Sequence, residues 1–289
     1  MHLLDAIALH LPPGFVIKDA IGTGATSTAY LARKDETGEQ LVVKVMKPGT
    51  VTPENKDRFV REMQVLQSLE HPRVIPILAP GEAAGALFFT MPFREGPTLR
   101  HRLRHGDPFT LAEAVTVARE VAEALGHAHS KGIVHRDVKP ENILLAADGA
   151  CLMDFGLANL TSLAWRTAGR ERSLTPVGTP AYMSPEQVKG DRAQDRRSDF
   201  YSLGCVLFEM LAGAPPFGLD SSRSTVSRRL RESPPDVRTR RPDVPDELAS
   251  LIRRLLDPHA SGRPASAVLL VGALERIVER LEEAGDSSP

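Results

Sequence analysis

The stretch His135-Arg-Asp-Val-Lys-Pro-Glu-Asn142 places a carboxylate, an ammonium group and a carboxamide within one short polar loop. The apolar run Ile143-Leu-Leu follows it and is typical of a β-strand. A second polar segment, Asp154-Phe-Gly156, follows the apolar run Ala150 to Met153, and its carboxylate comes twelve residues after Asn142. A solvated polar turn is the alternative for the first stretch alone. The second segment, at this spacing, favours a functional site over a solvated turn.

The residue types in these two segments match the requirements of phosphoryl transfer. That reaction needs a carboxylate that accepts the proton of the attacking hydroxyl, a cation near the transferred phosphate, and oxygen ligands for magnesium. Asp137, Lys139 and Asn142 supply these groups in turn, and Asp154 supplies a further magnesium ligand. We expect Phe155-Gly156 to place an aromatic ring in the interior and then to let the backbone reverse.

The composition is that of an ordinary globular protein. Of the 289 residues, 42% are hydrophobic and 25% charged, and 36 basic residues nearly cancel 37 acidic ones, so no basic field argues for nucleic-acid binding. Cys151 and Cys205 lie in apolar runs, which predicts buried thiols in a reducing compartment. The sequence shows no signal-peptide pattern and no stretch of roughly 20 apolar residues that could span a membrane. We expect a cytoplasmic protein, and nothing in the sequence supports an oligomer.

The first part of the chain, from Gly14 to about Met91, is predominantly strand-like. Short β-rich runs cover Phe15 to Ile21, Thr28 to Arg33 and Gln40 to Met46. Thr52-Pro53 is typical of a helix start, and His71-Pro72 is expected to end that helix. Its buried face is predicted to contain Phe59, Glu62, Met63, Leu66 and Leu69.

From about Leu99 onward, helical patterns dominate. Thr110 to Glu113 has the form of a capping box, and Ser198 to Ala212 is apolar on every side, as expected of a buried helix. Apolar residues recur at helical spacing at Ala114, Ala118, Val121, Leu125 and Ala128, and again at Leu270, Leu274, Ile277 and Leu281. A small β-rich lobe and a larger helical lobe would leave a cleft in which a ligand could bind.

Glycines and a lone lysine mark a candidate phosphate-binding region in the first part. Ile21-Gly-Thr-Gly-Ala-Thr-Ser-Thr-Ala29 lies between two strand-like runs, where Gly22 and Gly24 would let backbone N–H groups approach phosphates. A plain turn is the alternative. Lys44 lies in an apolar strand, either facing solvent or directed at phosphates. In the second case it needs an anionic partner, for which Glu62 is the candidate.

These motifs, in this order, resemble eukaryotic-type (Hanks-type) serine/threonine protein kinases of the bacterial kind. The resemblance covers roughly residues 15 to 283 and includes Gly178-Thr-Pro-Ala-Tyr-Met-Ser-Pro-Glu186. It implies an α+β, bilobal protein-kinase fold with a small β-rich N-lobe that carries one helix and a larger helical C-lobe. The implied divisions are an extension at 1–14, a kinase domain at 15–283 with N-lobe 15–91, hinge 92–95 and C-lobe 96–283, and a tail at 284–289.

The resemblance also implies cofactors, partners and residue roles. ATP and Mg²⁺, for which Mn²⁺ can substitute, would be bound, and proteins bearing Ser or Thr hydroxyls would be phosphorylated. The implied catalytic residues are Asp137, Lys139, Lys44, Glu62 and Thr179, and the implied metal ligands are Asn142 and Asp154. The implied nucleotide-binding residues are Ile21, Gly22, Gly24, Ser27, Ala29, Val42, Lys44, Met91, Pro92, Arg94 and Leu144. Among these, the Pro92 carbonyl and the Arg94 N–H would bond adenine.

Two structural roles follow from the same resemblance. Glu186 is expected to pair with Arg263, and Asp199 is expected to hold the backbone of the loop that carries Asp137. Lys139 and Thr179 match the pattern of kinases that act on serine or threonine rather than tyrosine.

Two other protein classes share parts of this pattern. A catalytically weak pseudokinase acting as a nucleotide-binding scaffold is the alternative function, but Lys44, Asp137 and Asp154 are all intact. A small-molecule kinase would lack the segment from Gly178 to Glu186, which forms a peptide platform in the family. Protein phosphorylation is therefore the favoured activity.

The resemblance suggests regulation through the segment that follows Asp154. An arginine at position 136 usually meets an anionic partner in this family, and Ser173 and Thr175 lie where related kinases carry activating phosphates. Autophosphorylation within residues 161–175 is expected, and a polar loop without a regulatory role is the alternative.

At the other end of the chain, the apolar residues Leu3, Leu4, Ile7 and Leu11 are expected to pack on the small lobe rather than on a partner.

Overall fold

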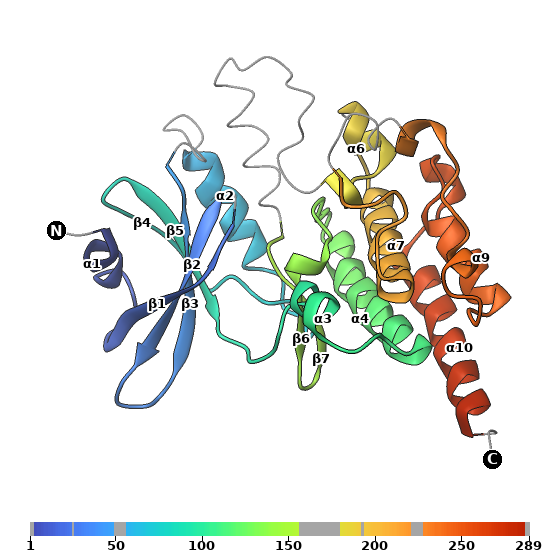
Figure 1. Cartoon of the computed structure of the whole chain (residues 1–289). Helices are drawn as coiled ribbons and strands as arrows, with labels where there is room; N and C mark the ends of the chain where they lie inside the picture. Colours follow the sequence, from blue (N-terminus) through green and yellow to red (C-terminus); the bar gives the residue numbers. More distant parts are fainter. Residues whose placement is uncertain are drawn as a thin grey trace. The chain divides into compact units, whose positions relative to one another are not determined.

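The computed structural model describes residues 3–24, 26–48, 56–155, 180–191, 194–220 and 228–286. These residues form two compact units, each with its own core. The described residues up to Glu95 belong to the first unit, and Gly96–Phe155 with the residues from Pro180 onward belong to the second. The first unit carries the sheet and the second carries most of the helices (Figure 1).

The first unit is built on a five-stranded antiparallel sheet. Its strands are β1 (Phe15–Thr23), β2 (Ser27–Lys34), β3 (Gln40–Met46), β4 (Ala79–Ala83) and β5 (Ala86–Pro92), in the spatial order β1-β2-β3-β5-β4. The first three strands confirm the strand-like runs of the sequence within two residues at each end. These runs are rich in β-branched and apolar residues, which favour strands, and the central strand β3 buries most of its residues.

A short N-terminal helix, α1 (Leu3–Ala8), covers one face of this sheet. Ile7 is fully buried and Leu11 is 8% exposed, and Leu3 and Leu4 pack against the same core. This confirms the predicted packing of the N-terminal residues on the β-rich unit. The sheet residues beneath them are Phe15, Ala32, Leu41, Val43, Val45, Ala83 and Phe88.

The opposite face of the sheet carries the residues expected to contact nucleotide. In the antiparallel register Ala29 lies across from Lys44, and Val42 lies across from Met91. Because directly opposed residues project to the same face and side chains alternate along a strand, these four residues share one face. The neighbouring residues Val43 and Val45 project to the face that α1 covers.

Helix α2 (Lys56–Leu66) buries Phe59 and Met63 completely, as the predicted apolar face requires. The expected start at Thr52-Pro53 lies outside the described residues. The expected end at His71-Pro72 is wrong, because the α-helix ends at Leu66. The Ser68 N–H donates to the Val65 carbonyl at 3.1 Å, and the Ser68 hydroxyl donates to the same carbonyl at 2.7 Å. These bonds replace the i→i−4 pattern of the helix.

The second unit contains α-helices whose bounds lie within the described residues, besides the helical residues 228–231. They are α3 (Leu99–His105), α4 (Leu111–Ser130), α6 (Pro185–Lys189), α7 (Arg197–Ala212), α9 (Asp246–Leu255) and α10 (Ala267–Asp286). A hairpin of β6 (Ile143–Ala146) and β7 (Gly149–Leu152) accompanies them, as do short 3₁₀ turns at Pro140–Asn142, Pro180–Tyr182, Val237–Thr239 and Ala260–Gly262.

Helix α7 is the centre of the second unit, since every residue from Ser198 to Leu211 is buried. Helix α4 packs against α7, α10 and β7. The capping box at Thr110 and Glu113 is present, and the predicted stripe of α4 is fully buried from Ala114 to Ala128. The sequence patterns for both helices are therefore confirmed.

Both cysteines are free and buried, as predicted, and burial raises the pKa of the Cys205 thiol to about 12. None of the helices in the described part of the chain has the combined length and hydrophobicity that crossing a bilayer requires.

Candidate active site

The loop from His135 to Asn142 is held by a carboxylate from the start of α7. Asp199 is fully buried, and its Oδ2 accepts the His135 N–H at 2.9 Å while its Oδ1 accepts the Arg136 N–H at 2.7 Å. His129 at the end of α4 bonds the same Oδ2 through Nε2 at 2.7 Å. The prediction that Asp199 fixes the backbone of this loop is confirmed.

His135 connects the loop to the residue that precedes Asp154. Its Nδ1 accepts the Asp137 N–H at 3.1 Å, so the ring proton lies on Nε2 and is donated to the Met153 carbonyl at 2.9 Å. The His135 and Phe155 rings are in contact, with centroids 4.5 Å apart, and Phe155 is 3% exposed. Both segments singled out in the sequence are thus joined through one imidazole.

Three of the predicted functional side chains meet directly. Lys139 Nζ donates to Asp137 Oδ2 at 2.6 Å, and Asn142 Nδ2 donates to the same oxygen at 3.1 Å and to the Asp137 carbonyl at 2.8 Å. The Asp137 side chain is 33% exposed. Asp137 therefore presents a partly accessible carboxylate that a cation and an amide hold in position, as a proton acceptor requires.

Arg136 and Asp154 both have left-handed backbone conformations with φ of +66°. This region costs a residue other than glycine on the order of 1–3 kcal/mol unless its surroundings enforce it. Arg136 is held on both sides, since its N–H donates to Asp199 and its carbonyl accepts from Gln187 Nε2 at 2.8 Å. Strained backbone of this kind is concentrated at functional sites.

Asn142 and Asp154 carry the kinds of oxygen atom that suit a hard divalent cation. The two bonds from Asn142 Nδ2 to Asp137 fix the orientation of the amide. Its nitrogen faces Asp137, and its oxygen makes no bond to Asp137. The pairing of β6 and β7 ends at Ile143 and Leu152, and the Met153 N–H then donates to the Asn142 carbonyl at 3.0 Å, so Asp154 follows two residues after the paired strand. Amide and carboxylate oxygens are the ligands that magnesium prefers.

The predicted phosphate-binding residues of the first unit lie on β1, β2 and β3. Ile21 and Gly22 end β1, the Gly24 N–H donates to the Ser27 carbonyl at 2.9 Å, and Ser27 is 4% exposed. Lys44 lies in the middle of β3, and Glu62 lies on the face of α2 that carries Phe59 and Met63. The Lys44–Glu62 ion pair stays a prediction.

The expected adenine residues fall into both units. Met91 and Pro92 end β5, and the Arg94 guanidinium donates to the Pro72 carbonyl at 3.2 Å. Leu144 lies in β6 and forms an isolated bridge with Thr98. Their contacts with nucleotide stay predictions.

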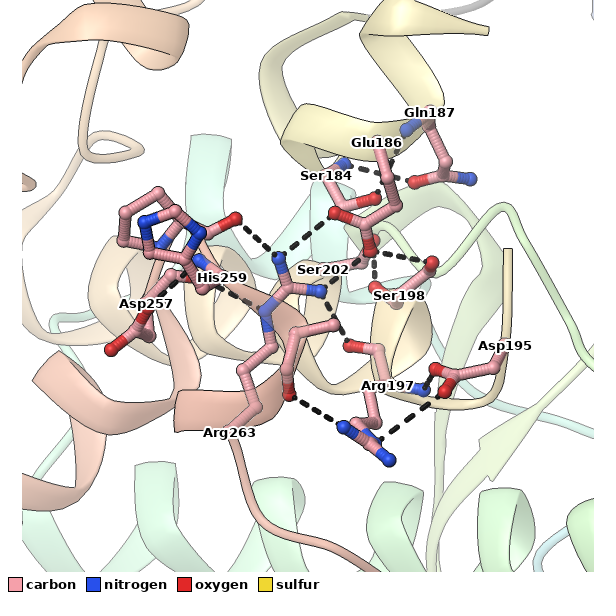
Figure 2. Close-up of polar contacts among 12 residues, drawn as sticks. Ser184, Glu186, Gln187, Asp195, Arg197, Ser198, Ser202, Asp257, His259 and Arg263 are labelled. Carbon is pink, nitrogen blue, oxygen red and sulfur yellow. Dashed lines mark hydrogen bonds and ion pairs between the residues drawn. The ribbon is translucent and has the colours of Figure 1, made fainter. Parts of the chain in front are cut away.

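The end of the Gly178–Glu186 segment is fixed by a buried ion pair (Figure 2). Arg263 donates to Glu186 from Nη1 at 2.6 Å and from Nη2 at 2.9 Å, and the Ser198 hydroxyl donates to the same carboxylate at 2.7 Å. Burial alone would raise the pKa of Glu186, but the bonds from Arg263 and Ser198 and the charge of Arg263 lower it to about 2. The predicted Glu186–Arg263 pair is confirmed.

Several positioning residues escaped the sequence analysis. Gln187 and Arg100 donate to the His135–Asn142 loop, and His129 bonds Asp199, which holds that loop. None of the three belongs to the motifs quoted from the sequence. A histidine in the last turn of the helix before the loop was the available signal for His129. Thr179, Gly156 and the whole of residues 161–175 lie outside the described residues.

Comparisons with known proteins agree with this site. The protein kinase domain family matches residues 15–272. The chain is 41% identical over 255 residues to the DNA damage-responsive serine/threonine-protein kinase RqkA of Deinococcus radiodurans, covering 86% of the chain and 37% of that protein. It is 34% identical over 274 residues to the serine/threonine-protein kinase PknB of Mycobacterium tuberculosis, covering 93% and 43%.

Two further likenesses extend the comparison. The serine/threonine-protein kinase pkn3 of Myxococcus xanthus is 34% identical over 282 residues, which is 94% of this chain and 51% of that protein. The chain spans 37 to 51% of the length of these curated relatives. A crystal structure of Rad53 1–466 in complex with AMP-PNP matches with a TM-score of 0.73 and 26% identity over 92% of this chain and 65% of that chain.

The expected α+β protein-kinase fold is thereby confirmed, together with the resemblance to bacterial serine/threonine kinases. On the family match and on these identities, the chain belongs to the protein kinase domain family.

Proposed function

We propose that the chain is a serine/threonine protein kinase that transfers the γ-phosphoryl group of ATP to a hydroxyl group of another protein. The observation that carries this proposal is the arrangement of Asp137, Lys139 and Asn142, in which one carboxylate receives a cation and an amide within 3.1 Å. The relatives named as serine/threonine kinases support the choice of acceptor.

In the proposed reaction, Asp137 orients the acceptor hydroxyl and takes its proton as the oxygen attacks the γ-phosphorus. A bond forms from the acceptor oxygen to phosphorus, and the bond from phosphorus to the β–γ bridging oxygen breaks, so ADP leaves with the electron pair. Lys139 balances negative charge beside Asp137 and is the candidate cation for the transferred group. Lys44, with Glu62 as its expected partner, would position the α- and β-phosphates.

Asn142 and Asp154 are the residues proposed to hold magnesium, and manganese is expected to substitute. When bound, the metal neutralises charge on the phosphate oxygens. The Asn142 amide nitrogen already donates to Asp137, which supports its oxygen as the atom that would bind the metal.

We further propose that residues 15–283 are the kinase domain, with a hinge at 92–95 whose Pro92 carbonyl and Arg94 N–H bond adenine. Gly22, Gly24 and Ser27 would contact phosphates, and Thr179 would contact Asp137 and Lys139. The buried thiols Cys151 and Cys205 support a reducing, cytoplasmic location.

The test is incubation of the chain with magnesium, labelled ATP and a generic protein acceptor, with phosphorylated positions mapped by mass spectrometry. The matched variant is Asp137→Asn, which removes the proton acceptor and keeps a side chain of the same shape. We expect nucleotide affinity to change little and turnover to fall by about 10²- to 10⁴-fold. Turnover of Asp137→Asn close to that of the parent would remove Asp137 from the role of base. A parent that binds nucleotide without phosphoryl transfer would make the chain a scaffold.

A further inference from the structure

A buried arginine outside the proposed reaction joins two functional segments of the second unit. Arg100, in the first turn of α3, is 8% exposed. Its Nε donates to Glu141 Oε1 at 2.9 Å, its Nη1 donates to Glu209 Oε1 at 2.8 Å, and its Nη2 donates to the Tyr182 hydroxyl. The Tyr182 hydroxyl in turn donates to Glu209 Oε2 at 2.5 Å. We refer to Arg100, Glu141, Tyr182 and Glu209 as the Arg100 cluster.

The members of the Arg100 cluster come from separate parts of the chain. Glu141 lies in the loop that carries Asp137, between Lys139 and Asn142. Tyr182 ends the Pro180–Tyr182 turn, and Glu209 lies near the end of α7. One guanidinium therefore contacts the proposed catalytic loop and the segment that follows Thr179.

The protonation states within the cluster fix the directions of these bonds. Burial and the adjacent Glu209 carboxylate raise the pKa of Tyr182 above its ordinary value, so its hydroxyl stays protonated and donates to Glu209. Burial alone would lower the pKa of Arg100, but its bonds to Glu209 and Glu141 and the charges around it raise that pKa. Arg100 is thus a permanent cation, and its planar fork serves three partners at once, which a lysine ammonium cannot reproduce.

The Pro180–Tyr182 turn is held firmly by other donors. Arg229, which is 1% exposed, donates to the Pro180 carbonyl through Nη1 and to the Ala181 carbonyl through Nη2 at 2.9 Å. The Ser202 hydroxyl donates to the Tyr182 carbonyl at 2.8 Å. Every carbonyl of the turn therefore accepts a bond from a buried side chain. The turn that carries Tyr182 is thus anchored through its backbone, and the Tyr182 hydroxyl and Glu141 share Arg100 as a donor.

We propose that Arg100 is a positioning residue that fixes the geometry of the catalytic loop relative to the Pro180–Tyr182 turn, and thereby the presentation of the protein acceptor to Asp137. This role rests on the proposed kinase function. It predicts a larger effect on the acceptor side of the reaction than on the nucleotide side, since no member of the cluster is itself an expected nucleotide contact.

The test compares Tyr182→Phe and Arg100→Met with the parent. Tyr182→Phe removes one hydroxyl and keeps the buried ring, so it remains informative if Arg100→Met fails to fold. The matched control is Arg102→Met on the same helix, because Arg102 pairs with Glu113 at 3.9 Å and lies over the Phe109 ring. We expect kcat/KM for the protein acceptor to fall about tenfold in Tyr182→Phe and further in Arg100→Met, with a smaller change, within about threefold, in the KM for ATP.

Hydrogen exchange supplies a readout that does not depend on catalysis. In both test variants we expect faster exchange in the peptides covering 135–142 and 180–187, and no such change in Arg102→Met. Acceptor kcat/KM within about twofold of the parent in both variants would overturn the proposal. The proposal would also be overturned by faster hydrogen exchange in the peptide covering 180–187 with no change in the peptide covering 135–142. If the parent transfers no phosphate, the proposed function fails, and the exchange result alone decides whether Arg100 couples the two segments.

Discussion

Replacing Glu186 with Gln removes one charge from the ion pair that ends the Gly178–Glu186 segment and leaves the shape of the side chain intact. Arg263 is fully buried at its side chain, and all five of its guanidinium protons have acceptors. Two of them go to Glu186, and the others go to the carbonyls of Asp257, Arg197 and Pro258. In Glu186→Gln, the buried Arg263 cation therefore has only neutral hydrogen-bond acceptors.

The magnitude of this loss follows from two considerations. Breaking a buried ion pair by removing one partner costs about 3–5 kcal/mol. The pKa of Glu186 falls from an ordinary 4.5 to about 2, which corresponds to about 3 kcal/mol of preference for the ionised form in the folded state. The Glu186 side chain is 16% exposed, so solvent screens little of this interaction. We expect Glu186→Gln to lower the free energy of unfolding by about 3 kcal/mol.

The assay is denaturant unfolding followed by circular dichroism at neutral pH. Its matched control is Glu247→Gln, which removes a charge from the exposed pair between Glu247 and Arg280, whose side chains are 37% and 66% exposed. Exposed pairs contribute about 0–1 kcal/mol, so the control should shift the unfolding midpoint little. Equal midpoint shifts in the two variants would refute the reasoning.

The same pair predicts how the difference between the parent and Glu186→Gln depends on pH. A carboxyl group whose pKa is lowered in the folded state contributes stability that is fully present above its unfolded pKa and is lost as the pH falls through its folded pKa. The difference should therefore be constant above about pH 5, shrink as the pH falls below 4.5, and vanish below pH 2. A difference that stays unchanged at pH 3 would contradict the assigned pKa.

Two further predictions concern the metal and the regulatory segment. Asp154→Asn should weaken magnesium–nucleotide binding and turnover together, by about tenfold or more, with partial recovery at raised magnesium in a titration of rate against metal concentration. Parent-like magnesium dependence would remove Asp154 from the metal site. The double variant Ser173→Ala, Thr175→Ala should lower activity toward an added protein several-fold and leave nucleotide affinity unchanged. The reason is that it removes the charge-assisted contact expected between a phosphate on this segment and Arg136. Mass spectrometry of the purified parent should then find phosphate at one of these positions. A parent that is fully active without that phosphate would exclude regulation by autophosphorylation.

The parts of the fold that the sequence predicted are those governed by local periodicity and local chemistry. Strand β3 around Lys44 is rich in β-branched, apolar residues, most of them buried, and the buried stripe of α4 recurs at helical spacing, so both are encoded in nearby residues. The end of α2 could not be placed in this way. His71-Pro72 is a strong breaker, but a serine hydroxyl three residues earlier ended the helix first, and this competition depends on side-chain geometry that composition does not reveal.

The reactive groups of the candidate site were predictable for a different reason. Asp137, Lys139 and Asn142 lie within one short loop, so their meeting requires no knowledge of the rest of the fold. Their backbone supports come from far along the chain. Asp199 is 64 residues from His135, and Gln187 is 51 residues from Arg136. The resemblance to a family supplied Asp199, and no local pattern supplied Gln187.

Arg100 shows why such supports escape pattern analysis. Leu99–His105 contains several basic residues, which is typical of a solvated helix face, and His101 and Arg104 are indeed exposed. Arg100 differs from them through its partners, which lie 41, 82 and 109 residues away in sequence. A buried guanidinium is tolerated because carboxylates and a hydroxyl satisfy it, so its burial becomes apparent when those partners are placed. The chemistry of the loop is therefore encoded locally, whereas its geometry is set by buried polar side chains that the folded helices bring to it from distant parts of the sequence.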